Sequence, residues 1–266
     1  MGQCSATVAL PIVSACGVEC AVLPSVVLSN HTGGFAGWTF RDMADDMADI
    51  ERQWIELGVR FDAFYTGYVC EGHVDRILSV MSSCAADGAV RIVDPVLGDG
   101  GRMYAGFSER FPAKMARLCA GADFILPNIT EAALLVGEEP RLSGYSRGDI
   151  ERLAGRLLAL GAKCVVLTGV SFAPGEIGFA VADGKSVEFR FGRMVTGRSS
   201  HGAGDVFASV FAGALMRGRA PVAAASLAAE TVLAALEATD AGHWYGMSFE
   251  KTLRRLAASF DDISEE

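Results

Sequence analysis

The sequence predicts an α/β protein, with a central, mostly parallel sheet between two helical layers as a three-layer α/β/α sandwich. Three observations support this fold class. Short apolar runs alternate with helical stretches, the runs are almost continuously apolar, and several helical stretches end in glycine. The chain has 266 residues and is 51% hydrophobic, which suffices for one large core. No internal repeat or linker interrupts it, so we predict a single domain over residues 1–266.

Residues up to Leu167 supply the parallel strands and the helices between them. Gly17, Gly58 and Gly161 each close a helical stretch, because glycine permits the left-handed turn that redirects the chain. The predicted strands are Ala21 to Leu28, Ala63 to Thr66, Val90 to Val93, Phe124 to Leu126 and Cys164 to Leu167. The predicted helices are Ser5 to Cys16, Met43 to Leu57, Val74 to Ala86, Ala113 to Ala120 and Ile150 to Leu160.

The pattern of the sequence changes after Leu167. Residues 178–191 predict a β-hairpin, because two apolar segments flank an Asp183-Gly184 turn. Alanine-rich helices follow. The predicted C-terminal elements are helices at Gly204 to Arg217, Pro221 to Glu237 and Phe249 to Ser259, and a frayed acidic tail from Asp261 to Glu266.

Composition excludes several classes of partner. A net charge of −9 argues against nucleic acid or an anionic membrane as the main partner. We expect no membrane span, because no apolar run approaches the length that a helix needs to cross a bilayer. The seven cysteines lack the spacing of a zinc site, and no signal peptide precedes them. We therefore expect reduced thiols and a cytoplasmic location.

The motif His201-Gly202-Ala203-Gly204-Asp205 precedes an apolar helix. Gly202, Ala203 and Gly204 would let the first helical amides point at one spot and form an anion hole for a phosphate group. Asp205 would then take a proton from an attacking hydroxyl. A simple alternative is a glycine-rich turn with Asp205 as a helix cap, and this motif alone does not separate the two interpretations.

Two further motifs each follow a predicted strand. Asp94 and Asp99 come after the strand that ends at Val93, and Asn128 and Glu131 stand three apart at the start of a helix. The carboxyl ends of strands are where open α/β sheets bind ligands. Oxygen ligands on such loops suit magnesium held largely through water and phosphate. An ordinary turn with a capping residue explains each of these motifs when it is taken alone. It explains less well why three such carboxylate-bearing turns occur in one chain.

Taken in order, five segments resemble the pyridoxal kinases of the ribokinase superfamily. The segments are Ser29-Asn30-His31-Thr32-Gly33, Thr66-Gly67-Tyr68, Asp94-Pro95-Val96-Leu97-Gly98-Asp99, Pro127-Asn128-Ile129-Thr130-Glu131 and Gly202-Ala203-Gly204-Asp205. The first two are the most specific. The resemblance implies a ribokinase-like fold and ATP-dependent phosphorylation of the 5′-hydroxymethyl group of a vitamin B6 compound. It also implies magnesium, often a monovalent cation, and a homodimer.

The resemblance also implies a role for each matching residue. Asp205 would be the catalytic base, beside the anion hole of Gly202, Ala203 and Gly204. The nucleotide and its metal would be bound by Asp94, Asp99, Asn128, Glu131, Thr168 and Tyr104, with Asp99 and Glu131 at the magnesium ion. The pyridine ring would be bound by Thr32, Tyr68 and His31. We expect neither His31 nor His201 to transfer a proton in the chemical step.

The sequence departs from the family at three places. Leu126 and Ala203 replace the usual threonines, and Ala203 keeps the backbone amide but loses a hydroxyl. The family opens with a strand and a substrate-contacting loop, whereas this sequence begins at about the end of that loop. We therefore expect the natural protein to have such a strand upstream of Met1, because an internal strand is costly to lose.

Three other functions stay open. A hydroxymethylpyrimidine kinase is less favoured, because those enzymes usually carry cysteine at the position of Asp205 and lack the segment at Ser29. A non-catalytic binder of vitamin B6 or nucleotide is the second alternative. A sugar kinase is the third, although the early Asp and Asn residues that usually select a sugar are missing. The sequence does not identify the preferred B6 vitamer.

Overall fold

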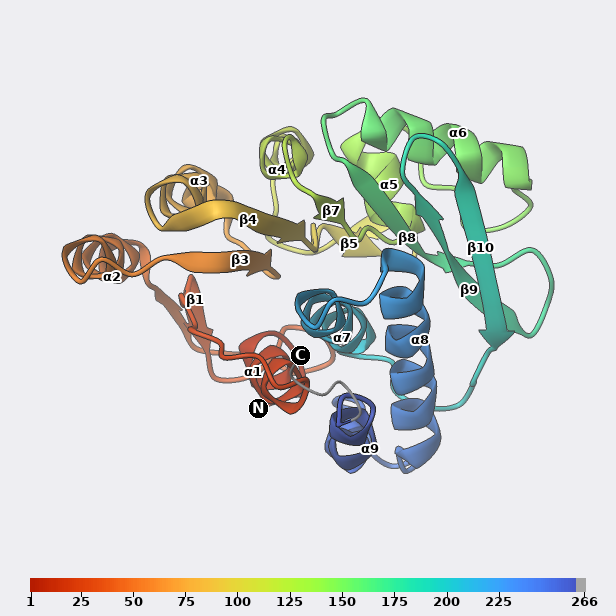
Figure 1. Ribbon diagram of the computed structural model, residues 1–266. Helices are drawn as coiled ribbons and strands as arrows, with labels where there is room; N and C mark the ends of the chain where they lie inside the picture. The colour runs from red at the N-terminus through yellow and green to blue at the C-terminus, as the bar shows by residue number, and fades with distance from the viewer. Residues whose placement is uncertain (262–266) are drawn as a thin grey trace. The chain divides into compact units, whose positions relative to one another are not determined.

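A six-stranded sheet dominates the larger of two compact units into which the chain divides (Figure 1). The structure is a computed structural model and describes residues 1–261. The sheet unit comprises residues 23–26 and 42–193, and the helical unit comprises residues 1–22, 27–41 and the chain from Met194. We describe each unit by itself. Whether both belong to one folding domain stays a prediction.

The sheet has the strand order β10-β9-β8-β7-β4-β3. The pairs β3–β4, β4–β7 and β7–β8 are parallel, whereas β8–β9 and β9–β10 are antiparallel. The strands are β3 (Phe61–Thr66), β4 (Ala85–Val93), β7 (Phe124–Ile125), β8 (Cys164–Val170), β9 (Glu176–Ala182) and β10 (Val187–Arg193). The prediction of a mostly parallel sheet with a C-terminal hairpin is therefore confirmed.

Helices of the sheet unit cover one face of its sheet. Figure 1 shows α3, α4, α5 and α6 on the same side of the strands. These helices carry buried apolar side chains at helical spacing, as Ile150, Leu153, Ala154 and Leu157 do in α6. The helices of this unit are α2 (Ala44–Glu56), η1 (Glu71–His73), α3 (Val74–Ser83), α4 (Phe111–Cys119), α5 (Ile129–Leu135) and α6 (Arg147–Leu158). Two short strands, β5 (Gly98–Asp99) and β6 (Arg102–Met103), form a separate antiparallel hairpin.

Two predicted elements differ from the structure. The predicted strand over Ala21 to Leu28 is wrong: only β1 (Val26–Leu28) is extended, and it pairs with β2 (Phe40–Asp42) outside the main sheet. The predicted helix ending at Ala86 stops at Ser83, because Ala85 already pairs with Phe61 in the sheet. In both cases pairing between distant segments overrides local preference.

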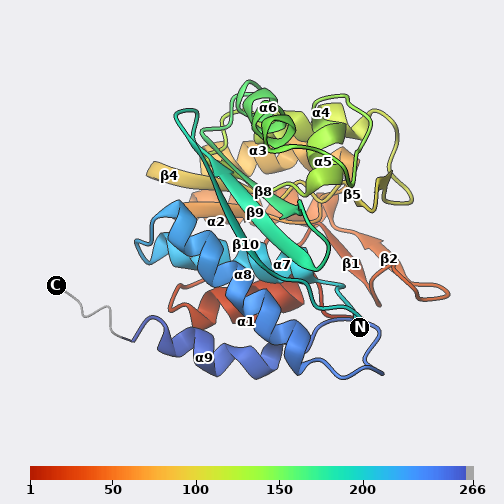
Figure 2. The same ribbon diagram turned by 90° about the vertical axis from the view of Figure 1, so that its right-hand side faces the viewer.

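The helical unit is built around α7 (Ala203–Met216), which packs against α1 (Ala6–Ala15) and α8 (Pro221–Ala238). The helix α9 (Leu253–Ala258) follows η2 (Phe249–Thr252) and lies beside α1 (Figure 2). These four helices agree with the sequence prediction. The predicted acidic tail, Asp261 to Glu266, lies outside the described residues except for Asp261.

The helix α8 meets the length and composition criteria for crossing a membrane, so the expectation that no apolar run reaches that length is wrong. It has 18 residues, and 28% of them are buried. The core helix of a water-soluble protein passes the same test. In this structure α8 packs against α7 through a row of small buried residues that includes Ala224, Ala228 and Ala235.

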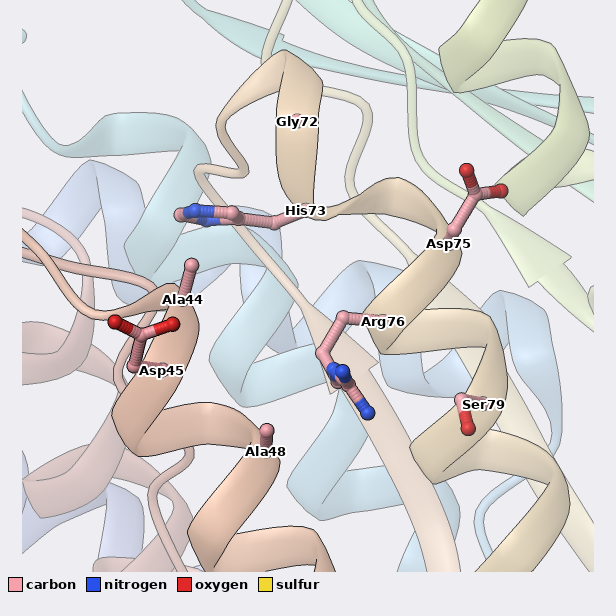
Figure 3. A pocket seen from close by; sticks show the side chains of 8 residues that line it. All are labelled: Ala44, Asp45, Ala48, Gly72, His73, Asp75, Arg76 and Ser79. Carbon is pink, nitrogen blue, oxygen red and sulfur yellow. The ribbon is translucent and has the colours of Figure 1, made fainter.

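A buried carboxylate joins α2 to α3 in the sheet unit. Glu51 is only 5% exposed, yet it accepts hydrogen bonds from Arg76 at 2.8 Å, Ser79 at 2.7 Å and Ser83 at 2.8 Å. Burial raises the pKa of this carboxyl, but the three donors outweigh it and hold the pKa below its usual range. Figure 3 shows Arg76 and Ser79 beside a hollow of about 460 Å³ between the two helices.

Replacing Glu51 with glutamine should destabilise the protein by about 1 to 3 kcal/mol, because the buried site loses an acceptor and a charge that the arginine and serines satisfy. Urea unfolding at pH 7 measures the loss. The lowered pKa predicts that the difference shrinks as the pH falls through the pKa of Glu51, where the parent carboxyl also becomes protonated. Asp49→Asn is the matched control in the same helix, since Asp49 forms an exposed pair with Arg52. Equal effects of the two variants would contradict this account.

Candidate active site

The predicted anion hole begins at the N-terminus of α7, in the helical unit. Gly202 precedes the helix with φ +84°, a left-handed conformation that favours glycine. A Cβ atom there would lie 2.0 Å from the carbonyl oxygen of Gln3, so the close approach also demands glycine. The N–H of Ala203 donates to Ser200 at 3.0 Å. Helix geometry leaves the next amides, of Gly204 and Asp205, without an intrahelical acceptor.

Asp205 lies in the first turn of α7 and is partly buried. Burial raises the pKa of its carboxyl to about 6, although the backbone N–H of Ser5 donates to it and partly offsets the rise. A carboxylate with a raised pKa is a stronger base than an ordinary aspartate and remains mostly ionised at neutral pH. The predicted role of Asp205 as a proton acceptor therefore suits its surroundings.

The segment that contacts Asp205 has a strained backbone. Ser5 has φ +53° and ψ −138°, a region that non-glycine residues rarely occupy. Such strain costs about 1 to 3 kcal/mol and persists only where surrounding contacts maintain it. Gln3 supplies contacts of this kind: its side-chain N–H donates to Glu250 at 2.8 Å, and its Oε1 accepts from Nε2 of His243 at 2.7 Å. Sequence analysis missed Gln3 and His243 because neither belongs to a motif.

His31 lies in the segment Ser29 to Gly33 and is hydrogen-bonded to another loop of the helical unit, at Tyr245. Its Nδ1 accepts from the N–H of Gly33 at 3.0 Å, so its Nε2 carries the proton and donates to the carbonyl of Tyr245 at 3.0 Å. The ring also lies 4.9 Å from that of His201, between ring centres. Both nitrogens of His31 are thereby engaged by the backbone. Thr32, next in the loop, is exposed.

Four of the predicted nucleotide and metal residues lie in or beside strands of the sheet unit. Asp94 is buried directly after β4, and its N–H donates to Thr66 at 3.0 Å. Thr168, in β8, forms an isolated parallel bridge with Asn128. Asn128 and Glu131 start α5 with reciprocal side-chain to backbone hydrogen bonds, which form a capping box.

Residues at the start of α5 also form hydrogen bonds with the hairpin β5–β6 and the turn before it. Glu131 accepts from the N–H of Leu97 at 3.0 Å, and Asn128 donates to the carbonyl of Gly98 at 2.9 Å. Thr130, which sequence analysis left without a role, accepts from Gly101 at 3.0 Å and is 1% exposed. Gly98 cannot be replaced without movement, because a Cβ would lie 2.2 Å from the carbonyl oxygen of Arg102. The predicted Asp99 sits in this hairpin.

Glu131, which the sequence predicts to lie at a magnesium ion, is hydrogen-bonded to the backbone. It is 4% exposed, and both carboxylate oxygens accept backbone N–H groups. Burial raises its pKa to about 7 even though Asn128, Leu97 and Gly98 donate to it, and the Asp99 carboxylate raises it further. Among residues 1–261 no cluster of three or more acidic, histidine or cysteine side chains is placed to hold a metal ion.

Magnesium does not require such a cluster, because it commonly uses one or two carboxylates together with phosphate and water. Asp94 and Asp99 supply carboxylates in the sheet unit, and Asp99 is exposed. One oxygen of Asp99 accepts from Gly100 at 2.8 Å. These two residues fit a magnesium ion bound mainly through a nucleotide.

Tyr68 and Tyr104, predicted to contact ligands, both lie in the sheet unit. Burial raises the pKa of Tyr68 to about 12, with a smaller contribution from Cys70. The Tyr68 ring stacks on Phe107, with 5.7 Å between ring centres and 24° between planes. Tyr104 is 42% exposed, and its N–H donates to Leu97. Sequence analysis missed Phe107 because no motif marks the loop that carries it.

The hollow in Figure 3 is not built from the predicted residues. Its lining comes from α2, η1 and α3, and includes His73, which is 3% exposed and bonded to Asp42 at 3.0 Å. The lining mixes the carboxylates of Asp45 and Asp75 with the guanidinium of Arg76. This mixture of charges does not define one class of ligand.

Known proteins resemble the chain over most of its length. The family model described as phosphomethylpyrimidine kinase matches residues 12–248. Pyridoxal kinase PdxY of Rubrobacter xylanophilus is 31% identical over 241 residues, which are 84% of this chain and 78% of the relative. The crystal structure of pyridoxal kinase from Lactobacillus plantarum is 29% identical, with a TM-score of 0.89, and the match covers 100% of this chain and 95% of that one.

A crystal structure from Bacteroides thetaiotaomicron is also similar. That protein is described as a phosphomethylpyrimidine kinase, and this crystal form is the one with pyridoxal. It is 30% identical, with a TM-score of 0.90, and the match covers 96% of this chain and 91% of that one. These likenesses confirm the predicted ribokinase-like fold class and the family resemblance.

Replacing His31 with phenylalanine should loosen the loop at Gly33, because the aromatic packing stays while both hydrogen bonds to the backbone are lost. Amide hydrogen exchange of Gly33 should increase by about tenfold. His201→Phe is the control, since that side chain contributes ring contact with His31 rather than the bond to Gly33. Unchanged exchange at Gly33 in the His31 variant would contradict the assignment.

Acid should have the same effect in the parent protein. Burial lowers the pKa of His31 below 6.5, because it disfavours the charged ring. The stabilisation is thus complete above pH 6.5 and is lost as the pH falls through the lowered pKa, where Nδ1 gains a proton and no longer accepts from Gly33. Exchange at Gly33, corrected for the intrinsic effect of pH, measures this change.

Proposed function

The chain belongs to the phosphomethylpyrimidine kinase family, in which its curated relatives include pyridoxal kinases, and we propose that it transfers the terminal phosphate of ATP to the 5′-hydroxymethyl group of pyridoxal. The observation that carries the proposal is Asp205 at the N-terminus of α7, behind the left-handed Gly202. The pairing of a basic carboxylate with first-turn amides suits transfer of phosphate to an alcohol.

Asp205 accepts the proton as the hydroxyl oxygen attacks the terminal phosphorus in line. The amides of Gly204 and Asp205 stabilise the charge that develops on the phosphoryl oxygens, assisted by the dipole of α7. The bond between the terminal phosphorus and the oxygen that bridges it to the β-phosphate breaks, ADP leaves, and the hydroxymethyl oxygen carries the phosphate as a new ester. The protein otherwise contributes positioning, because phosphoryl transfer needs little covalent chemistry from it.

Magnesium belongs to the same proposal. Asp94 and Asp99 would hold the ion, which neutralises the phosphates of the nucleotide. Thr168 would contact an ATP phosphate, and Tyr104 would lie near the nucleotide. We also propose that Thr32 and Tyr68 contact the pyridine ring and that the protein works in the cytoplasm as a homodimer. The resemblance to pyridoxal kinases implies that a monovalent cation often takes part as well.

Hydroxymethylpyrimidine phosphorylation is the second candidate, favoured by the description of the matching family model. Asp205 argues against this second function, because hydroxymethylpyrimidine kinases usually carry cysteine at the position of Asp205. Parallel assays with ATP, magnesium and each of pyridoxal, pyridoxine, pyridoxamine and hydroxymethylpyrimidine separate the two functions. We expect the highest kcat/KM with a B6 vitamer. A higher value with hydroxymethylpyrimidine would overturn the proposal, and no turnover with any acceptor would favour a non-catalytic binder.

Asp205→Asn should lower kcat for pyridoxal by about 100-fold to 10,000-fold, because the amide keeps the shape but does not accept the proton. The Kd for ATP should change little, since the backbone amides remain. In the parent, kcat/KM should rise with pH through about 6, where Asp205 ionises. A variant with near-parental kcat would remove Asp205 from the role of base.

A further inference from the structure

Backbone N–H groups donate hydrogen bonds to the carboxylate of Glu131. Its Oε1 accepts from the N–H of Leu97 at 3.0 Å, and its Oε2 accepts from the N–H of Asn128 at 2.9 Å. The N–H of Gly98 also donates to this carboxylate. With 4% of the residue exposed, these donors take the place of water around the charge.

The turn bound by Glu131 is strained at Val96. This residue has φ +36°, a conformation that is an outlier for a β-branched side chain. Leu97 and Gly98, whose N–H groups bind Glu131, follow it directly. A strained turn persists only where neighbouring groups hold it in place, and here those groups are on α5.

We propose that Glu131 is a positioning residue that holds the strained turn at Val96 and thereby fixes Asp94 before the turn and Asp99 after it. Glu131 acts through the backbone and is not a ligand of magnesium. The inference rests on the proposed kinase function for its catalytic consequence, but its structural part concerns only the sheet unit.

Direct metal ligation fits the geometry poorly. Magnesium requires near-octahedral oxygen ligands at short distance and retains several waters. At Glu131 the positive ends of backbone N–H dipoles already point at both oxygens, and burial leaves little space for hydrated metal. Asp99 differs because its residue is exposed and its recorded donor is the adjacent Gly100.

Two variants distinguish positioning from ligation. Glu131→Gln removes the charge and turns one acceptor into a donor that faces a backbone N–H. Glu131→Asp keeps the charge but shortens the side chain by one methylene, so that it no longer spans from Asn128 to Leu97; it is the variant to use if the first does not fold. Asp99→Asn is the matched control on the hairpin.

Amide hydrogen exchange without substrate gives the first measurement. Exchange at Leu97 and Gly98 should increase by about tenfold in the Glu131 variants, while amides of Val165 and Val166 in β8 keep their parental rates. Asp99→Asn should leave exchange at Leu97 unchanged. Unchanged exchange at Leu97 and Gly98 in both Glu131 variants would overturn the proposal.

The second measurement is a magnesium titration of pyridoxal phosphorylation. The Glu131 variants should show a lower kcat and should need more magnesium than the parent, but by a smaller factor than Asp99→Asn, because they loosen the turn that positions the two carboxylates and leave both carboxylates in place. A requirement that rises as much in Glu131→Gln as in Asp99→Asn would overturn the proposal. If the parent phosphorylates none of the acceptors, the proposed function fails, and the exchange measurement still decides whether Glu131 holds the turn.

Discussion

Hydrogen bonds from backbone N–H groups to buried or partly buried carboxylates are the interaction on which the candidate residues of each unit depend. Glu131 accepts such bonds at the start of α5, and Asp205 accepts one from Ser5 at the start of α7. A carboxylate without donors would be too costly to bury in its charged form. Backbone donors permit the charge while fixing where the chain runs, so the same bonds determine electrostatics and geometry.

The two carboxylates use this arrangement for different ends. Backbone N–H groups donate to both oxygens of Glu131, which serves the shape of the hairpin β5–β6, whereas Asp205 accepts from the backbone N–H of Ser5. A base needs a lone pair that is not already engaged. The number of donors around each group therefore separates the residue that organises a loop from the residue that is able to accept a proton.

Much of the fold follows from local sequence, but the details of the site do not. Gly17, Gly58 and Gly161 do adopt positive φ, as their position after helical stretches predicts. The spacing of Asn128 and Glu131 predicts that they meet at a helix start. It does not reveal that Glu131 turns toward Leu97, because that bond joins residues 34 positions apart. His31 shows the same limit, since its partner Tyr245 is 214 positions away.

Backbone strain concentrates beside the residues with proposed chemical roles. Among the described non-glycine residues, only Ser5 and Val96 have positive φ. Ser5 donates to Asp205, and Val96 lies two residues after Asp94 and three before Asp99. A relaxed turn at either place would aim the neighbouring N–H groups elsewhere, and the carboxylates would lose the donors that fix them. The strain is thus the structural cost of directing backbone amides at chosen carboxylates, which explains why it occurs at these two turns rather than at the many loops that carry no proposed function.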